Sequence, residues 1–190
     1  MRAGGAMLAV ALAVAGVPVS AADETGPLAP LRFLSGACWI AAYPGGRLAD
    51  LQCFEPMENG RFLRARHIVL GSDPAYSGET VYYADGATGR LLFIYFTSLG
   101  GVSRGTVVAE ADGLVFPDQW HVAADGSGLR LHTVLTPLGT ERYRIATRRW
   151  TGGAWSAPFA AEFRRLPGEC ATWEAARIRC GDVAAISAPG

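Results

Sequence analysis

The sequence predicts an all-β protein in which antiparallel strands, about 8–10 in number, form an up-and-down barrel with a short disulfide-bearing C-terminal tail. Short segments rich in valine, tyrosine, phenylalanine and threonine alternate with glycine-containing turns, a pattern typical of consecutive hairpins. No segment between these turns has the period of a long amphipathic helix. A meander of this kind leaves two exposed edge strands unless its first and last strands pair, and closure removes both edges. A two-sheet sandwich is the alternative arrangement with the same number of strands.

The N-terminus is typical of a secretory signal peptide. Arg2 precedes an apolar run over residues 6–17, and small residues follow at positions 20–22. The run is shorter than the roughly 20 apolar residues that a bilayer-spanning helix needs. We expect a signal peptide over residues 1–21, a linker over 22–32, a barrel over 33–166 and a tail over 167–190, in a periplasmic or secreted protein without a membrane span.

The charge balance argues against a nucleic-acid partner. The 17 basic residues, all arginine, equal the 17 acidic residues in number, so the net charge is near zero. A nucleic-acid-binding domain normally carries an excess of positive charge.

The turns define the strands in order. They lie at residues 44–46, 58–60, 72–74, 85–89, 99–101, 111–113, 125–128, 137–139 and 151–153. The strands expected between them span residues 38–43, 48–54, 61–70, 79–84, 91–98, 102–110, 114–122, 129–135, 141–149 and 158–165. Alternation supports several of them, since Leu129, Leu131 and Leu135 share one face while Arg130 and His132 share the other.

The segment 91–98 is apolar on both faces, which predicts that its outer face is covered. The candidates for this cover are the N-terminal segment, the C-terminal tail and a partner subunit. We therefore expect a monomer or a homodimer.

The four cysteines are expected to form disulfides, because an exported protein meets an oxidising environment. Counting outward from a four-residue loop at 44–47 places Cys38 directly opposite Cys53, within bonding range. Cys170 and Cys180 lie in a tail that has the composition of a short helix. Ten residues of continuous helix would separate them by about 15 Å, so a bond between them requires a break in the helix. A bond from the tail to the barrel is the alternative.

Histidines supply the candidates for metal binding or acid–base chemistry. His67, His121 and His132 have no spacing typical of a metal site, so no metal or cofactor is expected. Asp118 and His121 lie close enough in sequence for a general-base pair, but no nucleophile motif accompanies them. No catalytic residue is therefore assigned.

A second set of residues is suited to ligand binding. Arg64 and Arg66 lie among apolar residues, either inside the barrel, where they would meet an acidic head group, or on its surface. Aromatic side chains supply apolar surface for a ligand. The candidate ligand-binding residues are Arg64, Arg66, His67, Tyr83, Phe93, Tyr95 and Trp120.

Three segments in order, "FLSGACW", "CFEPMENGRFLRARHIV" and "TVYYADGATGRLLFIYF", make residues 31–166 resemble exported bacterial lipocalin-like and nitrobindin-like (calycin) proteins of unknown function. The resemblance is carried by Gly36, Trp39, Glu55, Pro56 and residues 60–63. It implies an antiparallel barrel whose interior holds a small, largely apolar molecule. The sequence thus favours a non-catalytic, exported barrel for a small hydrophobic ligand. The alternatives are a barrel enzyme with a His/Asp general base and an interaction module of the cell envelope.

Overall fold

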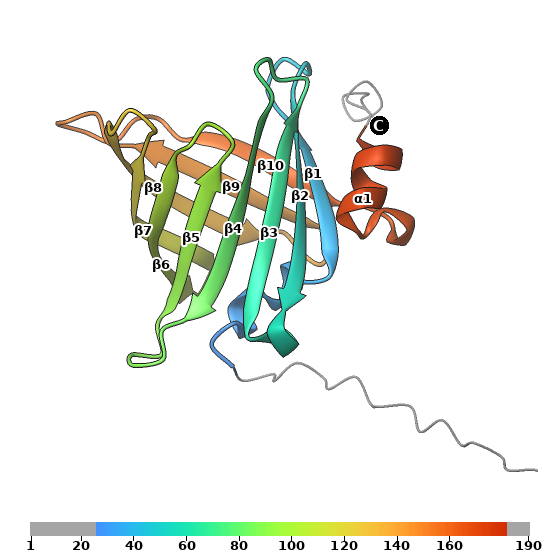
Figure 1. Cartoon of the computed structure of the whole chain (residues 1–190), viewed down its shortest axis with the longest axis horizontal. Coiled ribbons are helices and arrows are strands. Elements are labelled where there is room, and N and C mark those ends of the chain that lie inside the picture. The colour runs from blue at the N-terminus through green and yellow to red at the C-terminus, as the bar shows by residue number, and fades with distance from the viewer. Residues whose placement is uncertain (1–25, 182–190) are drawn as a thin grey trace, which may run out of the picture.

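The computed structural model describes residues 26–181, most of which belong to ten antiparallel strands (Figure 1). The strands are β1 (Ala37–Ala42), β2 (Ala49–Met57), β3 (Phe62–Leu70), β4 (Tyr76–Ala84), β5 (Leu91–Thr97), β6 (Val102–Glu110), β7 (Gly113–Val122), β8 (Gly128–Pro137), β9 (Arg142–Arg149) and β10 (Phe159–Arg165). The short helical segments are η1 (Ala29–Leu34), η2 (Glu58–Gly60), η3 (Gly168–Cys170), α1 (Trp173–Ala175) and η4 (Ala176–Cys180).

The strands form a closed barrel in which each strand pairs with its neighbours in the sequence. The ring closes where β1 meets β10, with Trp39 opposite Arg165 and Ile40 opposite Arg164. The fold class predicted from the sequence is therefore confirmed, and the two-sheet sandwich is excluded.

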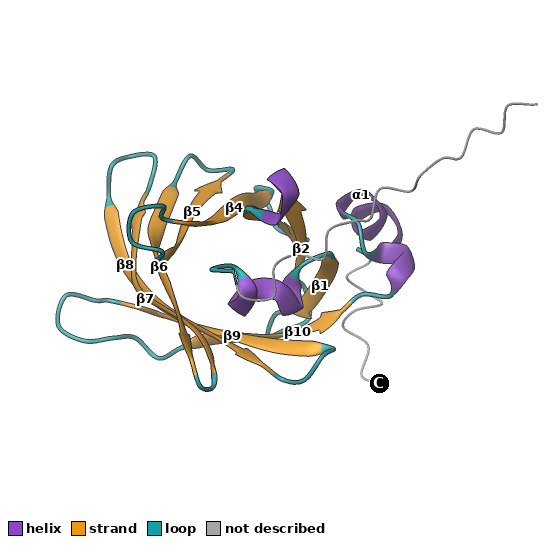
Figure 2. Cartoon of the chain, turned by 90° about the horizontal axis from the view of Figure 1, so that it is seen from below, coloured by secondary structure: helices purple, strands orange, loops and turns teal. Residues whose placement is uncertain are grey.

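One end of the barrel is filled by apolar side chains and closed by η1. Leu31 and Leu34 of η1 are fully buried and join the cluster that fills this end. Trp39 is also fully buried there, and its indole nitrogen donates to the carbonyl of Leu34 at 3.5 Å. In the view from below, η1 lies across the barrel opening (Figure 2). Most of η1 lies within residues 22–32, which were expected to be a linker, so this closing helix was not predicted.

The β1–β2 hairpin has the register that its loop predicts. Cys38 pairs with Cys53 across the ladder, and a disulfide joins them with their Cα atoms 4.0 Å apart. In the tail, Cys170 and Cys180 are bonded to each other at a Cα separation of 6.4 Å. The helical path is interrupted between η3 and α1, which brings the two cysteines within reach. Of the two connectivities left open for the tail, the structure shows the internal bond.

The C-terminal segment covers the outer face of β1 and β2. Cys170, Trp173 and Ala176 pack against outward-facing residues of these strands, among them Ile40 and Leu51. This tail and the N-terminal segment were two of the expected covers for residues 91–98. Neither covers β5 within residues 26–181, since η1 closes the barrel end and the tail lies over β1 and β2. Phe96, on the outer face of β5, is 45% exposed.

The proposed signal peptide, residues 1–21, lies outside the described residues, as does the end of the tail from residue 182. No helix within residues 26–181 is long and apolar enough to span a bilayer.

Candidate functional site

The barrel interior contains a cavity of about 240 Å³. It adjoins the apolar cluster that fills the end closed by η1. Half of its lining is apolar or aromatic and consists of Phe54, Ala65, Tyr82, Phe93, Phe116, Leu135 and Ile145. The other half is polar and consists of Gln52, His67, Thr80, Tyr95, Gln119, Thr133 and Thr147. The cavity therefore suits a mainly apolar molecule that carries a polar group.

The polar side chains lie farther from η1 than the apolar ones on the same strands. β3 runs away from the closed end, so His67 lies beyond Leu63 and Ala65. β2 runs the opposite way, and Asp50 therefore lies beyond Phe54. The barrel interior is thus apolar toward η1 and polar toward its other end.

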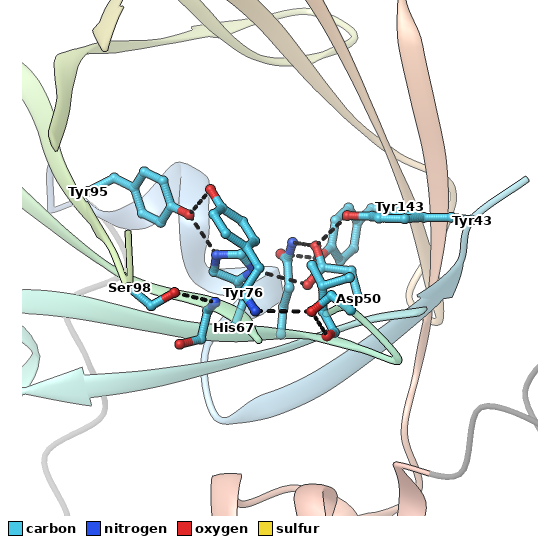
Figure 3. A network of polar contacts seen from close by, with 11 residues as sticks. Tyr43, Asp50, His67, Tyr76, Tyr95, Ser98 and Tyr143 are labelled. Carbon is cyan, nitrogen blue, oxygen red and sulfur yellow. Dashed lines mark hydrogen bonds and ion pairs between the residues drawn. The ribbon is translucent and has the colours of Figure 1, made fainter. Parts of the chain in front are cut away.

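A hydrogen-bonded network crosses this polar end (Figure 3). His67 Nδ1 lies 3.1 Å from Asp50 Oδ1, and His67 Nε2 lies 2.7 Å from the Tyr95 hydroxyl oxygen. The Tyr95 hydroxyl in turn lies 2.9 Å from that of Tyr76. The network links β2, β3, β4 and β5 through one imidazole ring.

Asp50 anchors the network. Its side chain is 7% exposed, and Oδ2 accepts hydrogen bonds from Gln52 Nε2 at 2.8 Å and from the Tyr43 hydroxyl at 3.3 Å. An ionised carboxylate only accepts hydrogen bonds, so the nearby Nδ1 of His67 carries a proton and donates to Oδ1. In neutral His67 the lone pair then resides on Nε2, where it accepts from the Tyr95 hydroxyl. Asp50 thereby fixes both the orientation and the tautomer of the imidazole.

Gln52 extends the network to the opposite wall. Its Oε1 accepts a hydrogen bond from the Tyr143 hydroxyl at 2.9 Å. Tyr143 is fully buried, stacked on Phe163 and in edge contact with Trp39. The polar network therefore rests directly on the apolar cluster.

Gly78 makes room for the contact between Tyr95 and His67. It lies opposite His67 on β4, the strand between β3 and β5. A Cβ atom at position 78 would lie 2.6 Å from the Tyr95 hydroxyl oxygen. The missing side chain lets the Tyr95 ring cross β4 and reach the imidazole.

Burial and the Asp50 carboxylate suppress ionisation of the interior tyrosines. Burial raises the pKa of Tyr43, Tyr95 and Tyr143, and the nearby negative charge of Asp50 raises it further. For Tyr95, the hydrogen bond to Tyr76 adds to the same shift. These hydroxyls stay protonated at neutral pH, so they serve as neutral hydrogen-bonding groups.

The structure brings together three of the seven candidate ligand-binding residues. His67, Phe93 and Tyr95 line the interior cavity, whereas Arg64, Arg66, Tyr83 and Trp120 do not. Strand alternation explains the division on β3 and β4, because Leu63, Ala65, His67 and Tyr82 face inward and their neighbours face outward. Trp120 follows a register shift between Phe116 and Gln119 and is 51% exposed.

Arg64 and Arg66 have partners on the outer face. Both guanidinium groups contact Glu55, at 2.7 and 2.6 Å, and Arg66 also lies 5.1 Å from the ring centre of Trp173. Of the two positions left open by the sequence, inside or outside the barrel, the structure shows the outer one. These arginines join the outer surfaces of β2 and β3 through Glu55.

The other two histidines lie apart from this network. His121 Nδ1 is 2.9 Å from the hydroxyl of Ser103, which is 2% exposed. His132 contacts Trp155 on the outer face. The Asp118 side chain lies outside the described part of the structure, so the suggested pair with His121 stays a prediction. Among the described residues, no group of three or more acidic, cysteine or histidine side chains is arranged to hold a metal.

Asp50, Gln52 and Tyr76 were missed by sequence reasoning. Counting outward from a four-residue loop at 58–61 places Gln52 opposite His67 and Asp50 diagonally across from it, whereas the three-residue turn expected at 58–60 would pair Gln52 with Arg66. Prediction of the contact between this carboxylate and the histidine therefore depended on the length of the loop. Tyr76 lies before the predicted strand at 79–84, which in the structure starts three residues earlier.

A larger hollow of about 520 Å³ lies outside the barrel, between η1 and the turn from β2 to β3. Gly26 and Pro27, where the described chain starts, form part of its wall, and the titratable side chains in its lining are Arg32 and Arg61. The hydrogen-bonded network faces the smaller interior cavity, so we assign the candidate site there.

No model of a known protein family matches this sequence, and no curated protein matches it significantly.

Proposed function

We propose that this protein binds a small, mainly apolar ligand inside the barrel, with His67, Phe93 and Tyr95 among the contacting residues. The observation that carries the proposal is the interior cavity with an apolar half and a polar half. The resemblance of residues 31–166 to lipocalin-like and nitrobindin-like proteins supports the same type of function.

The cavity volume limits the size of the ligand. A cavity of roughly 150 Å³ holds a benzene molecule, and the interior cavity measures about 240 Å³. A single aromatic or alicyclic ring with a short substituent fits this space. Burial of its apolar surface contributes roughly 25 cal/mol per Å² before the cost of ordering the complex.

The polar half of the lining favours a neutral ligand with a carbonyl or hydroxyl group. The lining includes amide, hydroxyl and imidazole groups but no arginine or lysine. Asp50, just beyond the cavity wall, makes this end unfavourable for an anion. A neutral polar group can exchange hydrogen bonds with Tyr95 or Gln119 without a buried unpaired charge.

We also propose that binding takes place outside the cytoplasm, in the periplasm or after secretion. The two disulfides support this location, because such bonds persist in oxidising compartments.

Titration calorimetry with acetophenone tests the proposal, using a matched pair of variants. Ala65 lines the cavity, so Ala65→Leu fills part of the space and should weaken binding about tenfold, which corresponds to about 1.4 kcal/mol. Ala160 lies between inward-facing residues of β10 and faces outward, so Ala160→Leu should leave affinity unchanged. Equal affinity in both variants, or failure of the unmodified protein to bind any of acetophenone, phenylacetone and 3-cyclohexenone, would contradict an interior site.

A further inference from the structure

The interior network contains a base that binding of an apolar ligand does not require. The Asp50 side chain is 7% exposed, and burial of a carboxylate is unfavourable unless several donors compensate for the lost water. Here the compensating donors include Nδ1 of His67. The result is an imidazole whose Nε2 lone pair is directed at a tyrosine hydroxyl in the cavity wall. A carboxylate that orients an imidazole in this way is an arrangement used in general-base catalysis.

We propose that His67 and Tyr95 are catalytic residues of a proton-transfer site that isomerises a small, neutral carbonyl compound in the interior cavity. The inference rests on the proposed function, because the substrate is the ligand of that cavity. Asp50 and Gly78 act as positioning residues, Asp50 through the imidazole and Gly78 by leaving space for Tyr95.

The reaction moves one proton and needs no co-reactant. The Tyr95 oxygen takes a proton from the carbon next to the carbonyl group, and the hydroxyl proton of Tyr95 passes at the same time to Nε2 of His67. The electron pair of the broken C–H bond moves into the enolate, and the imidazolium is stabilised by Asp50. The reverse transfer returns a proton to the same carbon or, in a β,γ-unsaturated ketone, to the γ-carbon, which shifts the double bond.

The polar wall also supplies a group for the enolate oxygen. Gln119 lines the same cavity, and its Oε1 accepts a hydrogen bond from Thr133 at 2.7 Å. That bond fixes the amide orientation, and among the described residues nothing accepts a hydrogen bond from its Nε2. These amide hydrogens can donate to the negative charge that develops on the carbonyl oxygen.

The network favours isomerisation over hydrolysis. Protonated His67 lies between Asp50, which faces Nδ1, and Tyr95, which faces Nε2. The proton on Nε2 can therefore return to the ligand through Tyr95. An isomerisation returns the proton to the molecule that lost it. Hydrolysis would require both an activated water and a proton donor at the leaving group, placed on the correct sides of the scissile bond.

Deuterium exchange tests the elementary step. Acetophenone, phenylacetone and 3-cyclohexenone are incubated with the protein in D₂O, and NMR follows the loss of the hydrogens next to the carbonyl group. The protein should accelerate exchange for the members of this panel that bind, and should convert 3-cyclohexenone to 2-cyclohexenone. His67→Gln and Tyr95→Phe should each slow exchange about 100-fold, with affinity within a few-fold of the unmodified protein.

The variants Gly78→Ala and Asp50→Asn test the positioning residues. Gly78→Ala leaves the imidazole unchanged but displaces Tyr95, so exchange should fall while binding persists. Asp50→Asn should lower the rate of exchange while affinity stays within a few-fold of the unmodified protein, because Nδ1 of His67 loses the carboxylate that orients the ring. A purely structural role for Asp50 would lower the amount of folded protein and would reduce binding and exchange together.

Two outer-face substitutions control for general effects of mutation. His132→Gln and Tyr83→Phe change the same residue types outside the barrel and should leave exchange unchanged.

Binding without exchange above the buffer rate would overturn this inference and leave the proposed function intact. Exchange that persists in His67→Gln would overturn it as well. Failure of all three compounds to bind would overturn both proposals.

Discussion

Cys38 lies directly opposite Cys53 in the β1–β2 ladder, and their disulfide closes a hairpin with a sequence separation of 15 residues. Because the bond restricts the unfolded chain, replacing both cysteines with alanine should lower the free energy of unfolding by about 3 kcal/mol. Urea denaturation measures this difference. The barrel itself should persist, since the ladder holds the hairpin register without the bond. The pair Cys170 and Cys180, with a separation of 10 residues, should contribute slightly less.

The Glu55 cluster should make stability depend on pH in the acid range. Burial by itself would raise the pKa of Glu55, but hydrogen bonds from Arg64 and Arg66 outweigh it and lower the pKa below 4.5. The unfolded chain then binds the proton more tightly than the folded one. The stabilisation is present above pH 4.5 and is lost as the pH falls through the folded-state pKa.

Glu55→Gln measures this contribution. The three side chains are nearly a third exposed, so solvent screens their attraction, and the loss at pH 7 should be about 1 kcal/mol. The difference from the unmodified protein should shrink in urea denaturation near pH 3. A constant difference between pH 7 and pH 3 would show that the charge of Glu55 is not its cause.

The buried tyrosines should cause unfolding in alkali. Burial raises the pKa of Tyr43, Tyr82, Tyr95 and Tyr143 above 10, so the folded protein holds these protons more tightly than the unfolded chain. Their contribution to stability is complete below pH 10 and falls as the pH rises above it. The absorbance of tyrosinate should rise for these four of the six tyrosines only when near-ultraviolet circular dichroism is lost. Their ionisation near pH 10 in folded protein would contradict the buried environment.

The strands were predictable because turns and strands have separate local signals. All ten expected segments correspond to strands, and the first cysteine pair follows from counting residues around one loop. Glycine and proline mark the turns, while alternation and β-branched or aromatic residues mark the strands. The segment η1 lacks such a signal, because its helical form depends on burial of Leu31 and Leu34 against the barrel.

It was harder to predict which side chains of a strand point into the barrel and which point outward. β3 carries apolar residues on both faces, so its pattern alone could not decide whether His67 or its arginine neighbours face inward. The outward position of the two arginines depends on their contacts with Glu55 and Trp173. Trp173 is more than 100 residues away from Arg66 in the sequence. The candidate site was likewise only partly predictable, because Asp50 gains its role from its contact with His67 across the ladder.

The C-terminal cover should stabilise the barrel from outside. Trp173 is 9% exposed and packs in the cluster on β1 and β2, and the guanidinium of Arg66 lies over its ring. Trp173→Ala should lower the free energy of unfolding by about 3 kcal/mol, as expected for removal of a large buried aromatic side chain. Trp155→Ala, at a partly exposed tryptophan in the connection between β9 and β10, should have a smaller effect in the same denaturation experiment.

Gln52 should be intolerant of a negative charge, because it joins Asp50 to Tyr143. Gln52→Glu keeps the shape of the side chain but replaces the donor to Asp50 with a second carboxyl group. At pH 7 the two carboxylates repel each other in a partly buried site, and the free energy of unfolding should fall by about 3 kcal/mol. Repulsion raises the pKa of the introduced carboxyl in the folded state, so stability should recover as the pH falls toward 5. Denaturation at both pH values measures this recovery, and a loss of stability independent of pH would indicate a packing defect instead of charge repulsion.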